Sequence, residues 1–485
     1  MSWKSDESEI FARVSTNTLN TYAVERDERK TARADSERLV LDDHTWRDLG
    51  IFESDGAEVC LFDFCNRTIT GGGSRALRRR MENPWANAQR IRDVQASLTC
   101  ILENRSAYDL LLPVLYGAGR VERYVESSLP MVTDLSPLGF SLGVCGLRIE
   151  HDRDYARISI GVHITCQLIR DLRRFVESEH LQNARGELAE LLDEIASVLA
   201  LPVFTRLPNR SLGGMWFWRT LRIDQNFRLH EKTSLDRLLE LVHEVEVLTV
   251  MADVTQEHGF VFPQIADGTL RVHADGLVHP LIRDAVANSA DLDQNRRLLF
   301  LTGPNMAGKT TYLRAFATAF YFAHLGMGVP ARSFSFVPAQ RLFSSISVND
   351  DLCQGISYFR AEALRTKAVA QALAEGYRVV AIMDEPFKGT NVKDAMDASL
   401  AILSRLADRT DCLFMFSSHL IELAEELSSL GTVDCRYFEA EESGGRLQFN
   451  YVLQHGVSSQ RLGMRVLQEE GIFDLLDNMN SSTGV

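Results

Sequence analysis

Cysteine is scarce in this sequence. The 485 residues include 8 cysteines, which are too few and too widely spread for a disulfide framework. Only Cys60 and Cys65 lie close together, and no second pair accompanies them, so we do not expect a zinc site. The cysteines are expected to be small buried hydrophobic residues of a protein in a reducing compartment.

Long hydrophobic runs are also missing. The longest weakly polar stretch, residues 315–329, contains Thr318 and His324 and is shorter than the ~18 apolar residues that a membrane span needs. The opening residues MSWKSDESEI have no apolar core of the kind a signal peptide requires. We therefore expect a cytoplasmic protein with no membrane partner.

Basic residues are fewer than acidic ones. The chain has 52 Lys and Arg against 66 Asp and Glu, a net charge of −14. Affinity for phosphate backbones grows with the number of basic contacts, so this balance argues against wholesale coating of nucleic acid, although it permits a local basic surface. The apolar content of 45% and the length are those of a folded chain of about three domains.

The one basic cluster is ambiguous. Residues 67–92 contain seven arginines and a single acidic residue, Glu82. Such a cluster is usually a solvated helix face or a set of internal ion pairs, with a nucleic-acid contact as the alternative. Within it, Gly71–Gly73 predict a turn before a helix that opens near Ser74.

Long helices are predicted between residues 155 and 255. Apolar residues recur there at three- to four-residue spacing over 168–176, 188–199 and 235–248. The aromatic residues Trp216, Phe217 and Trp218 lie between these helices; a core position is the favoured interpretation, and stacking on bases is the alternative. From about residue 260, short β-type runs alternate with helical ones, which indicates a parallel sheet covered by helices.

The strongest motif is a phosphate-binding loop, G-x4-G-K-[ST]. It follows an apolar strand and precedes a helix, so backbone N–H groups and the helix N-terminus can surround phosphate oxygens. The side chain of Lys309 is predicted to reach the β- and γ-phosphates, and the hydroxyl of Thr310 to ligate Mg²⁺. The predicted ATP-binding residues are Gly303, Pro304, Asn305, Met306, Ala307, Gly308, Lys309, Thr310 and Thr311.

A second strand ends in two acidic residues. The run VVAIMDE places Asp384 to complete the Mg²⁺ shell and Glu385 to orient or deprotonate the attacking water. A third strand, CLFMFSSH, ends in His419, which could sense the γ-phosphate or could be structural. The predicted catalytic residues are Lys309, Glu385 and His419.

Several motifs together resemble one family. The segments GPNMAGKTTY, MDEPFKGTN, FSSH and NDDLCQGISYFRAE are similar, in order, to the ATPase domain of the MutS family of DNA mismatch-repair proteins. The resemblance implies that Ser357, with Phe359 and Glu362 in register, belongs to a loop that reaches the partner's γ-phosphate across a dimer. It also implies ATP and Mg²⁺ as cofactors and DNA as a partner, and it raises the expectation for His419.

The resemblance extends toward the N-terminus and suggests the domain organisation. We expect a charged arm over 1–37, a MutS-like core domain over 38–130, lever helices over 131–258, and a P-loop ATPase domain over 259–485. The predicted fold class is an all-α core and lever domain followed by an α/β P-loop NTPase domain with a mostly parallel sheet. The core resemblance makes a DNA role for the clustered arginines less expected.

Departures from the family pattern qualify this expectation. The sequence that resembles the core domain begins near residue 38. This leaves no room for the family's N-terminal mismatch-sensing domain, with its Phe-x-Glu wedge, or for its connector domain. The insert between the lever helices is short, so the DNA clamp is expected to be reduced or absent. Lys388 replaces the usual Arg of D-E-x-G-R-G-T, and Phe387 the Gly before it. The segment VANSADL offers no aromatic residue to stack on adenine.

Two functions remain open. The first is a homodimeric MutS-like ATPase that uses ATP to switch its lever helices around DNA, in repair or recombination, without mismatch sensing of its own. The alternative is an ATP-gated protein-interaction module that has lost DNA binding. A transporter- or cohesin-like ATPase is disfavoured because the chain contains no LSGGQ-type segment.

Overall fold

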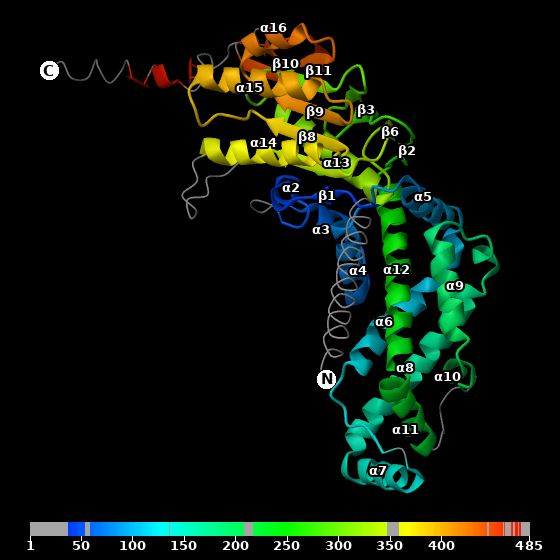
Figure 1. Ribbon diagram of the computed structural model, residues 1–485. Helices are drawn as coiled ribbons and strands as arrows, with labels where there is room; N and C mark the ends of the chain where they lie inside the picture. Colours follow the sequence, from blue (N-terminus) through cyan, green and yellow to red (C-terminus); the bar gives the residue numbers. More distant parts are fainter. Residues whose placement is uncertain are drawn as a thin grey trace, which may run out of the picture.

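The computed structural model has an elongated shape, with a sheet-containing body at one end and a long helical arm projecting from it (Figure 1). It describes residues 37–53, 59–134, 136–207, 217–346, 358–443 and 446–458, with residues 460, 467–468, 471–473 and 475–476 beyond them.

The arm is a bundle of long helices. Helix α12 (Lys232–Glu257) runs along it from the body, and α7 (Pro137–Glu150) lies across its far end (Figure 1). The three predicted apolar stripes fall on α8, α9 and α12 and are largely buried, which confirms the helical interpretation. The remaining described helices of the arm and its base are α2 (Asp43–Asp48), α3 (Leu61–Cys65), α4 (Gly71–Glu82), α5 (Ala88–Glu103), α6 (Leu111–Val125), α8 (Asp152–Val176), α9 (Glu187–Leu199), α10 (Pro202–Thr205) and α11 (Phe217–Gln225).

The body is built on a seven-stranded sheet of order β1-β7-β8-β9-β5-β10-β11. All neighbouring pairs are parallel except β10 and β11, so the prediction of a mostly parallel sheet is confirmed. The strands are β1 (Val40–Leu41), β5 (Leu298–Thr302), β7 (Arg341–Ser345), β8 (Val379–Asp384), β9 (Cys412–Ser417), β10 (Val433–Ser443) and β11 (Arg446–His455). A second, mixed sheet has the order β2-β6-β3-β4, from β2 (Gln264–Ile265), β3 (Val272–Leu277), β4 (Asn288–Leu292) and β6 (Ser333–Phe336).

Helices cover the large sheet and connect it to the arm. They are α13 (Lys309–Leu325), α14 (Tyr358–Ala374), α15 (Val392–Ala407) and α16 (Ile421–Ser428). One hydrophobic cluster is continuous from the arm through α13 to Leu299 and Leu301 of β5, whereas Leu298 and Phe300 point to a second cluster on the opposite face. This alternation along β5 is that of a strand buried on both faces.

The N-terminal segment contributes to the body, which the sequence did not reveal. Residues 38–130 were expected to be all-α, but β1 forms the edge of the large sheet by pairing in parallel with β7. Asp48 of α2 then accepts hydrogen bonds from the Ser344 hydroxyl and the Ile346 N–H. A two-residue strand carries almost no periodic signal, so only the tertiary structure shows it.

The prediction of a glycine turn ahead of α4 was wrong. The helix begins at Gly71 rather than near Ser74, and the Thr70 side chain caps it by accepting from the Gly73 N–H. Glu246 of α12, itself 1% exposed, accepts from the backbone N–H and the hydroxyl of Thr70. A carboxylate from another helix therefore satisfies donors at the start of α4.

The glycines allow α4 and α12 to approach closely. A Cβ at Gly72 would lie 2.0 Å from His243, and one at Gly73 would lie 2.1 Å from Glu246. Both glycines are thus required here for their missing side chain, because no non-bonded atoms pack at such distances.

The arginine cluster is paired with carboxylates of the same chain. Each of its seven members lies in an ion pair, but all except Arg80 keep side chains at least 38% exposed, so the cluster is a solvated surface whose charges are paired within the protein. Arg80 is the most buried of them, and burial opposes its charge while Glu187 and Glu244 raise its pKa. The pairs are Arg67–Glu257, Arg75–Glu122, Arg78–Glu82, Arg79–Glu244, Arg80–Glu187, Arg90–Glu190 and Arg92–Asp267.

Phe217 and Trp218 pack against the hydrophobic core. This confirms the core position that the sequence favoured over stacking on bases for these two residues, whereas Trp216 lies outside the described residues.

Among the described helices, none is long and apolar enough to cross a bilayer.

The C-terminal end of α13 joins the body to the base of the arm. His324 is fully buried, its Nδ1 donates to the Phe320 carbonyl, and its Nε2 accepts from the Ala339 N–H. Its own carbonyl accepts from the Trp85 N–H. Burial lowers the pKa of His324 to about 4, so this histidine is neutral in the folded protein.

We expect Gly72→Ala to destabilise the protein by about 1–3 kcal/mol, because the added methyl group collides with the His243 ring. Gly71→Ala is the matched control: its Cβ would meet only the Arg75 guanidinium at 3.7 Å, so its stability should change by less than about 1 kcal/mol. Urea unfolding of both variants measures the difference. Equal stabilities would contradict the close packing of α4 on α12.

We expect the free energy of unfolding to fall as the pH decreases from 7 to 4. The unfolded His324 binds a proton near its usual pKa of 6.5, whereas the folded one does so only near 4, so acid favours the unfolded chain by an amount on the order of 3 kcal/mol. His324→Gln should unfold more easily at pH 7 but show a shallower pH dependence in denaturant titrations. An unchanged slope would show that His324 titrates normally in the fold.

Candidate functional site

The predicted phosphate loop connects β5 to α13. Gly303 and Gly308 have φ angles of 140° and 102°, which side chains rarely adopt. A Cβ at Gly303 would also lie 2.8 Å from the Phe438 carbonyl oxygen of β10. Both glycines of the motif are therefore required by the backbone path, as the pattern predicted.

Lys309 lies under this loop and is 5% exposed. Its Nζ donates to the carbonyl oxygens of Gly303 and Pro304 at 2.8 and 3.1 Å and lies 3.4 Å from Glu385 Oε1. Burial lowers the pKa of Lys309, and the Glu385 carboxylate opposes that shift. The ammonium group is thus held among acceptors at the floor of the loop.

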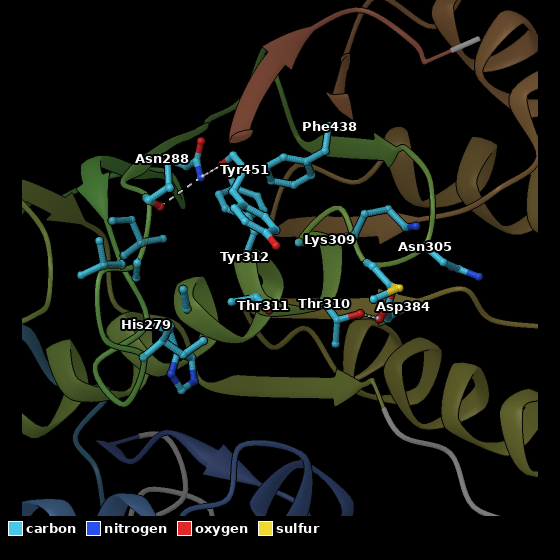
Figure 2. A pocket seen from close by; sticks show the side chains of 18 of the residues that line it. His279, Asn288, Asn305, Lys309, Thr310, Thr311, Tyr312, Asp384, Phe438 and Tyr451 are labelled. Atoms are coloured by element: carbon cyan, nitrogen blue, oxygen red, sulfur yellow. Dashed lines mark hydrogen bonds between the residues drawn. The ribbon is translucent and has the colours of Figure 1, made fainter. Parts of the chain in front are cut away.

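Thr310 and Asp384 meet although 74 residues separate them. The Thr310 hydroxyl donates to Asp384 Oδ2 at 2.5 Å, a contact visible in Figure 2. The hydroxyl of Ser417, at the end of β9, donates to the other oxygen, Oδ1. These contacts fix the orientation of the carboxylate between the start of α13 and the end of β9.

Glu385 is surrounded by basic side chains. Its carboxylate contacts the imidazole of His419, lies 2.5 Å from the ammonium of Lys388 and is close to Lys309. Burial acts to raise its pKa, but the hydrogen bonds from His419 and Lys388 and the charge of Lys309 outweigh burial and hold the pKa at about 2. Its φ of 48° is uncommon for a non-glycine residue and is typical of functional turns.

The cavity beside these groups has a volume of about 570 Å³. At one end it is lined by Lys309, Thr310 and Asp384, and at the other by Asn288 and Tyr451 (Figure 2). Its size fits a nucleotide or another drug-sized ligand. The remaining predicted loop residues that line it are Pro304, Asn305, Met306, Gly308 and Thr311.

Tyr451 places an aromatic ring at the cavity. From the sequence, no aromatic residue had been found for this purpose in the segment VANSADL, residues 286–292. The ring is 45% exposed and lies next to Gly308, whose Cβ would meet Tyr451 Cδ1 at 3.2 Å. Asn288 holds the tyrosine backbone by donating to its carbonyl oxygen at 2.9 Å and accepting from the Leu453 N–H. No local motif marks Tyr451, because its place depends on β11 folding back beside β10.

Two other residues were not predicted in their observed roles. Lys388 was noted only as a departure from the family pattern, yet it binds Glu385. Ser417 belongs to the quoted segment FSSH, yet only His419 was singled out there. Polar residues at the carboxyl end of a buried strand are the signal that could have identified Ser417.

The predicted residues of the phosphate loop lie together, with Gly303 at the start of the loop and Ala307 buried within it.

Ser357 lies outside the described residues. Of its neighbours, Glu362 of α14 is 2% exposed, and burial raises its pKa while the backbone N–H groups of residues 387–389 oppose that shift. Helix α14 therefore contacts the turn that follows Glu385.

No group of three or more His, Cys, Asp or Glu side chains positioned for a metal ion occurs in the part of the chain that the structure describes. The pair formed by Thr310 and Asp384 still fits Mg²⁺, which prefers oxygen ligands and is usually bound through one or two protein groups together with substrate phosphates.

Comparisons with known proteins agree with this architecture. A model of MutS domain III matches residues 44–375, and a model of MutS domain V matches residues 299–476. The DNA mismatch repair protein MutS of Brevibacillus brevis is 34% identical over 245 residues, which cover 48% of this chain and 28% of that relative. The match thus spans less than a third of the relative's length. Since the domain III model alone covers more than half of the chain, the protein belongs to the MutS family.

Proposed function

We propose that this protein is a Mg²⁺-dependent ATPase, with residues 259–485 as its P-loop ATPase domain. One observation carries the proposal: Lys309, Thr310, Asp384, Glu385 and His419, drawn from three parts of the sequence, converge beside a nucleotide-sized cavity. A chance glycine loop would not bring a hydroxyl, two carboxylates and an imidazole together in this arrangement. Membership of the MutS family supports the same activity.

The reaction is attack of water on the γ-phosphate of ATP. Backbone N–H groups of the loop and Lys309 bind the phosphates and stabilise the charge that develops on them. Thr310 and Asp384 would hold Mg²⁺, which would supply charge neutralisation at the phosphates. The exposed ring of Tyr451 offers a stacking surface for the base.

Glu385 orients the attacking water; it does not act as the general base that removes a proton from that water. A carboxylate whose pKa is about 2 is a weak base near neutral pH, since proton transfer is most efficient when the pKa lies near the working pH. Its contacts with His419 and Lys388 fix its direction. His419 is placed to respond to the γ-phosphate through Glu385.

Each ATP site is completed by a second copy of the chain. In this proposal Ser357, which precedes α14, reaches the γ-phosphate of the partner, and Glu362 anchors that helix against the turn after Glu385. The homodimer would hold two composite sites.

We expect Glu385→Gln to bind ATP but to hydrolyse it at least about 100-fold more slowly, because the amide cannot orient water as the carboxylate does. Lys309→Ala should lose both binding and turnover. Phosphate release and equilibrium binding of a fluorescent ATP analogue distinguish the two effects. Glu375→Gln, at an exposed position in the turn that follows α14, is the matched control. Normal turnover by Glu385→Gln would disprove its proposed role.

We further propose that ATP switches the helical arms around DNA, in repair or recombination, without mismatch sensing by these residues. The continuous packing from α13 into the arm supports such coupling. One observation favours the alternative, an ATP-gated module that binds protein: all seven clustered arginines are paired internally, so they offer DNA little uncompensated charge.

We expect matched, mismatched and branched duplexes to bind this chain with an affinity that falls steeply with salt and differs little between matched and mismatched DNA. Fluorescence anisotropy at several fixed salt concentrations, with the ATPase rate measured in the same samples, tests this. A clear mismatch preference would contradict the absence of mismatch sensing. No binding, together with an ATPase rate that DNA leaves unchanged, would favour the protein-interaction module.

A further inference from the structure

The turn that follows β8 has an unusual backbone. Glu385 and Phe387 have φ angles of 48° and 68°, in the left-handed region that side chains rarely adopt. These two residues lie close together in the chain, and one of them carries a large aromatic ring. A turn of this kind persists only when its surroundings hold it in place. The neighbours of residues 385–389 must therefore supply the restraint.

The ring of Phe387 provides part of this restraint. It is 2% exposed and packs against Phe359 in the first turn of α14, with the two ring centroids 5.9 Å apart and the ring planes inclined by 57°. Phe387 belongs to neither of the two hydrophobic clusters that the described residues form. Its burial is therefore local, and it ties the turn to the start of α14.

Glu362 holds the same turn from the same face of α14. It lies three residues after Phe359, a spacing that places both side chains on one face of the helix. Glu362 is buried, and hydrogen bonding from the N–H groups of residues 387–389 acts against the rise in its pKa that burial causes. Because Glu362 Oε2 has no hydrogen-bond partner among the described residues, these N–H groups are the main compensation for the buried charge.

The turn also carries Lys388, which binds Glu385. The Lys388 ammonium lies 2.5 Å from Glu385 Oε2, although the Lys388 side chain is 53% exposed. A long exposed side chain keeps such a contact only when its backbone is held at the right distance. The Glu385 N–H donates to the Ser417 carbonyl, so β9 fixes the backbone that enters the turn. Helix α14 fixes the backbone that leaves it.

The other groups of the site are held independently of α14. Lys309 and Thr310 begin α13, and Asp384 is the last residue of β8. Thr310 and Asp384 contact each other directly. The restraint from α14 therefore acts on the direction of Glu385 and leaves the proposed ligands of phosphate and Mg²⁺ in place.

We propose that Phe387 and Glu362 are positioning residues for ATP hydrolysis: they lock the turn of residues 385–389 to the first two turns of α14, and the locked turn directs the Glu385 carboxylate at the attacking water. This inference rests on the ATPase proposed above and adds the requirement that the start of α14 be in place. A shift of that end of α14 then turns hydrolysis off while ATP stays bound.

The kinetics of ATP hydrolysis by the full chain test the proposal. Phe387→Gly, which removes the ring and relieves the backbone strain, should lower kcat about 10- to 100-fold while KM changes less than about twofold, because only the direction of Glu385 is lost. Phe359→Ala should have the same effect, whereas Phe359→Tyr, which keeps the ring, should preserve turnover. Leu364→Ala, at an exposed apolar position on α14, is the matched control.

Two further measurements separate positioning from a merely structural role. The double variant Phe359→Ala with Phe387→Gly should be no slower than the slower single variant, because both changes remove one ring contact. Hydrogen exchange gives a readout that needs no turnover: the amide hydrogens of residues 387–389 should exchange at least about tenfold faster in Phe359→Ala and in Glu362→Gln than in the unmodified protein.

Several results would overturn the proposal: a kcat that Phe387→Gly and Glu362→Gln leave unchanged, a rise in KM alone, costs that add in the double variant, or unchanged hydrogen exchange at the turn. The same data separate this proposal from the ATPase itself. Turnover that survives all of these variants would overturn only the positioning role. An unmodified protein that fails to hydrolyse ATP, although exchange at the turn responds to Phe359→Ala, would overturn only the proposed ATPase.

Discussion

The burial of α13 is the constraint on which the rest of the structure depends. Its first residue, Lys309, lies at the floor of the phosphate loop, and its last turn carries His324, which is fully buried between the body and the N-terminal segment. A helix packed on all sides cannot shift at one end without displacing its neighbours at the other. Events at the phosphate loop are therefore connected to the base of the arm through one rigid element.

Many charged groups of this protein are paired within the chain. The seven clustered arginines bind carboxylates of the same chain, and Glu385 is held among Lys309, Lys388 and His419. Binding of a nucleotide would bring further negative charge to the same ammonium and imidazole groups. The charge balance around Glu385 then depends on which anion these groups contact, and this would give the proposed ATPase a physical means of responding to its nucleotide.

The arm and the body present different surfaces to partners. In the body the functional groups line a cavity of about 570 Å³, whereas α7, at the far end of the arm, exposes Leu138, Leu142 and Ile149.

Local patterns in the sequence were sufficient for the glycine loop between β5 and α13, the acidic end of β8 and the long helices, because each is encoded by neighbouring residues with a fixed period or spacing. Other features needed the tertiary structure. Thr70 and Glu246 start α4 at Gly71, and Tyr451 reaches the cavity only because β11 folds back beside β10. Whether an arginine faces solvent or a carboxylate, and whether a glycine makes a turn or a close helix contact, depends on residues far away in the chain, which local spacing does not specify.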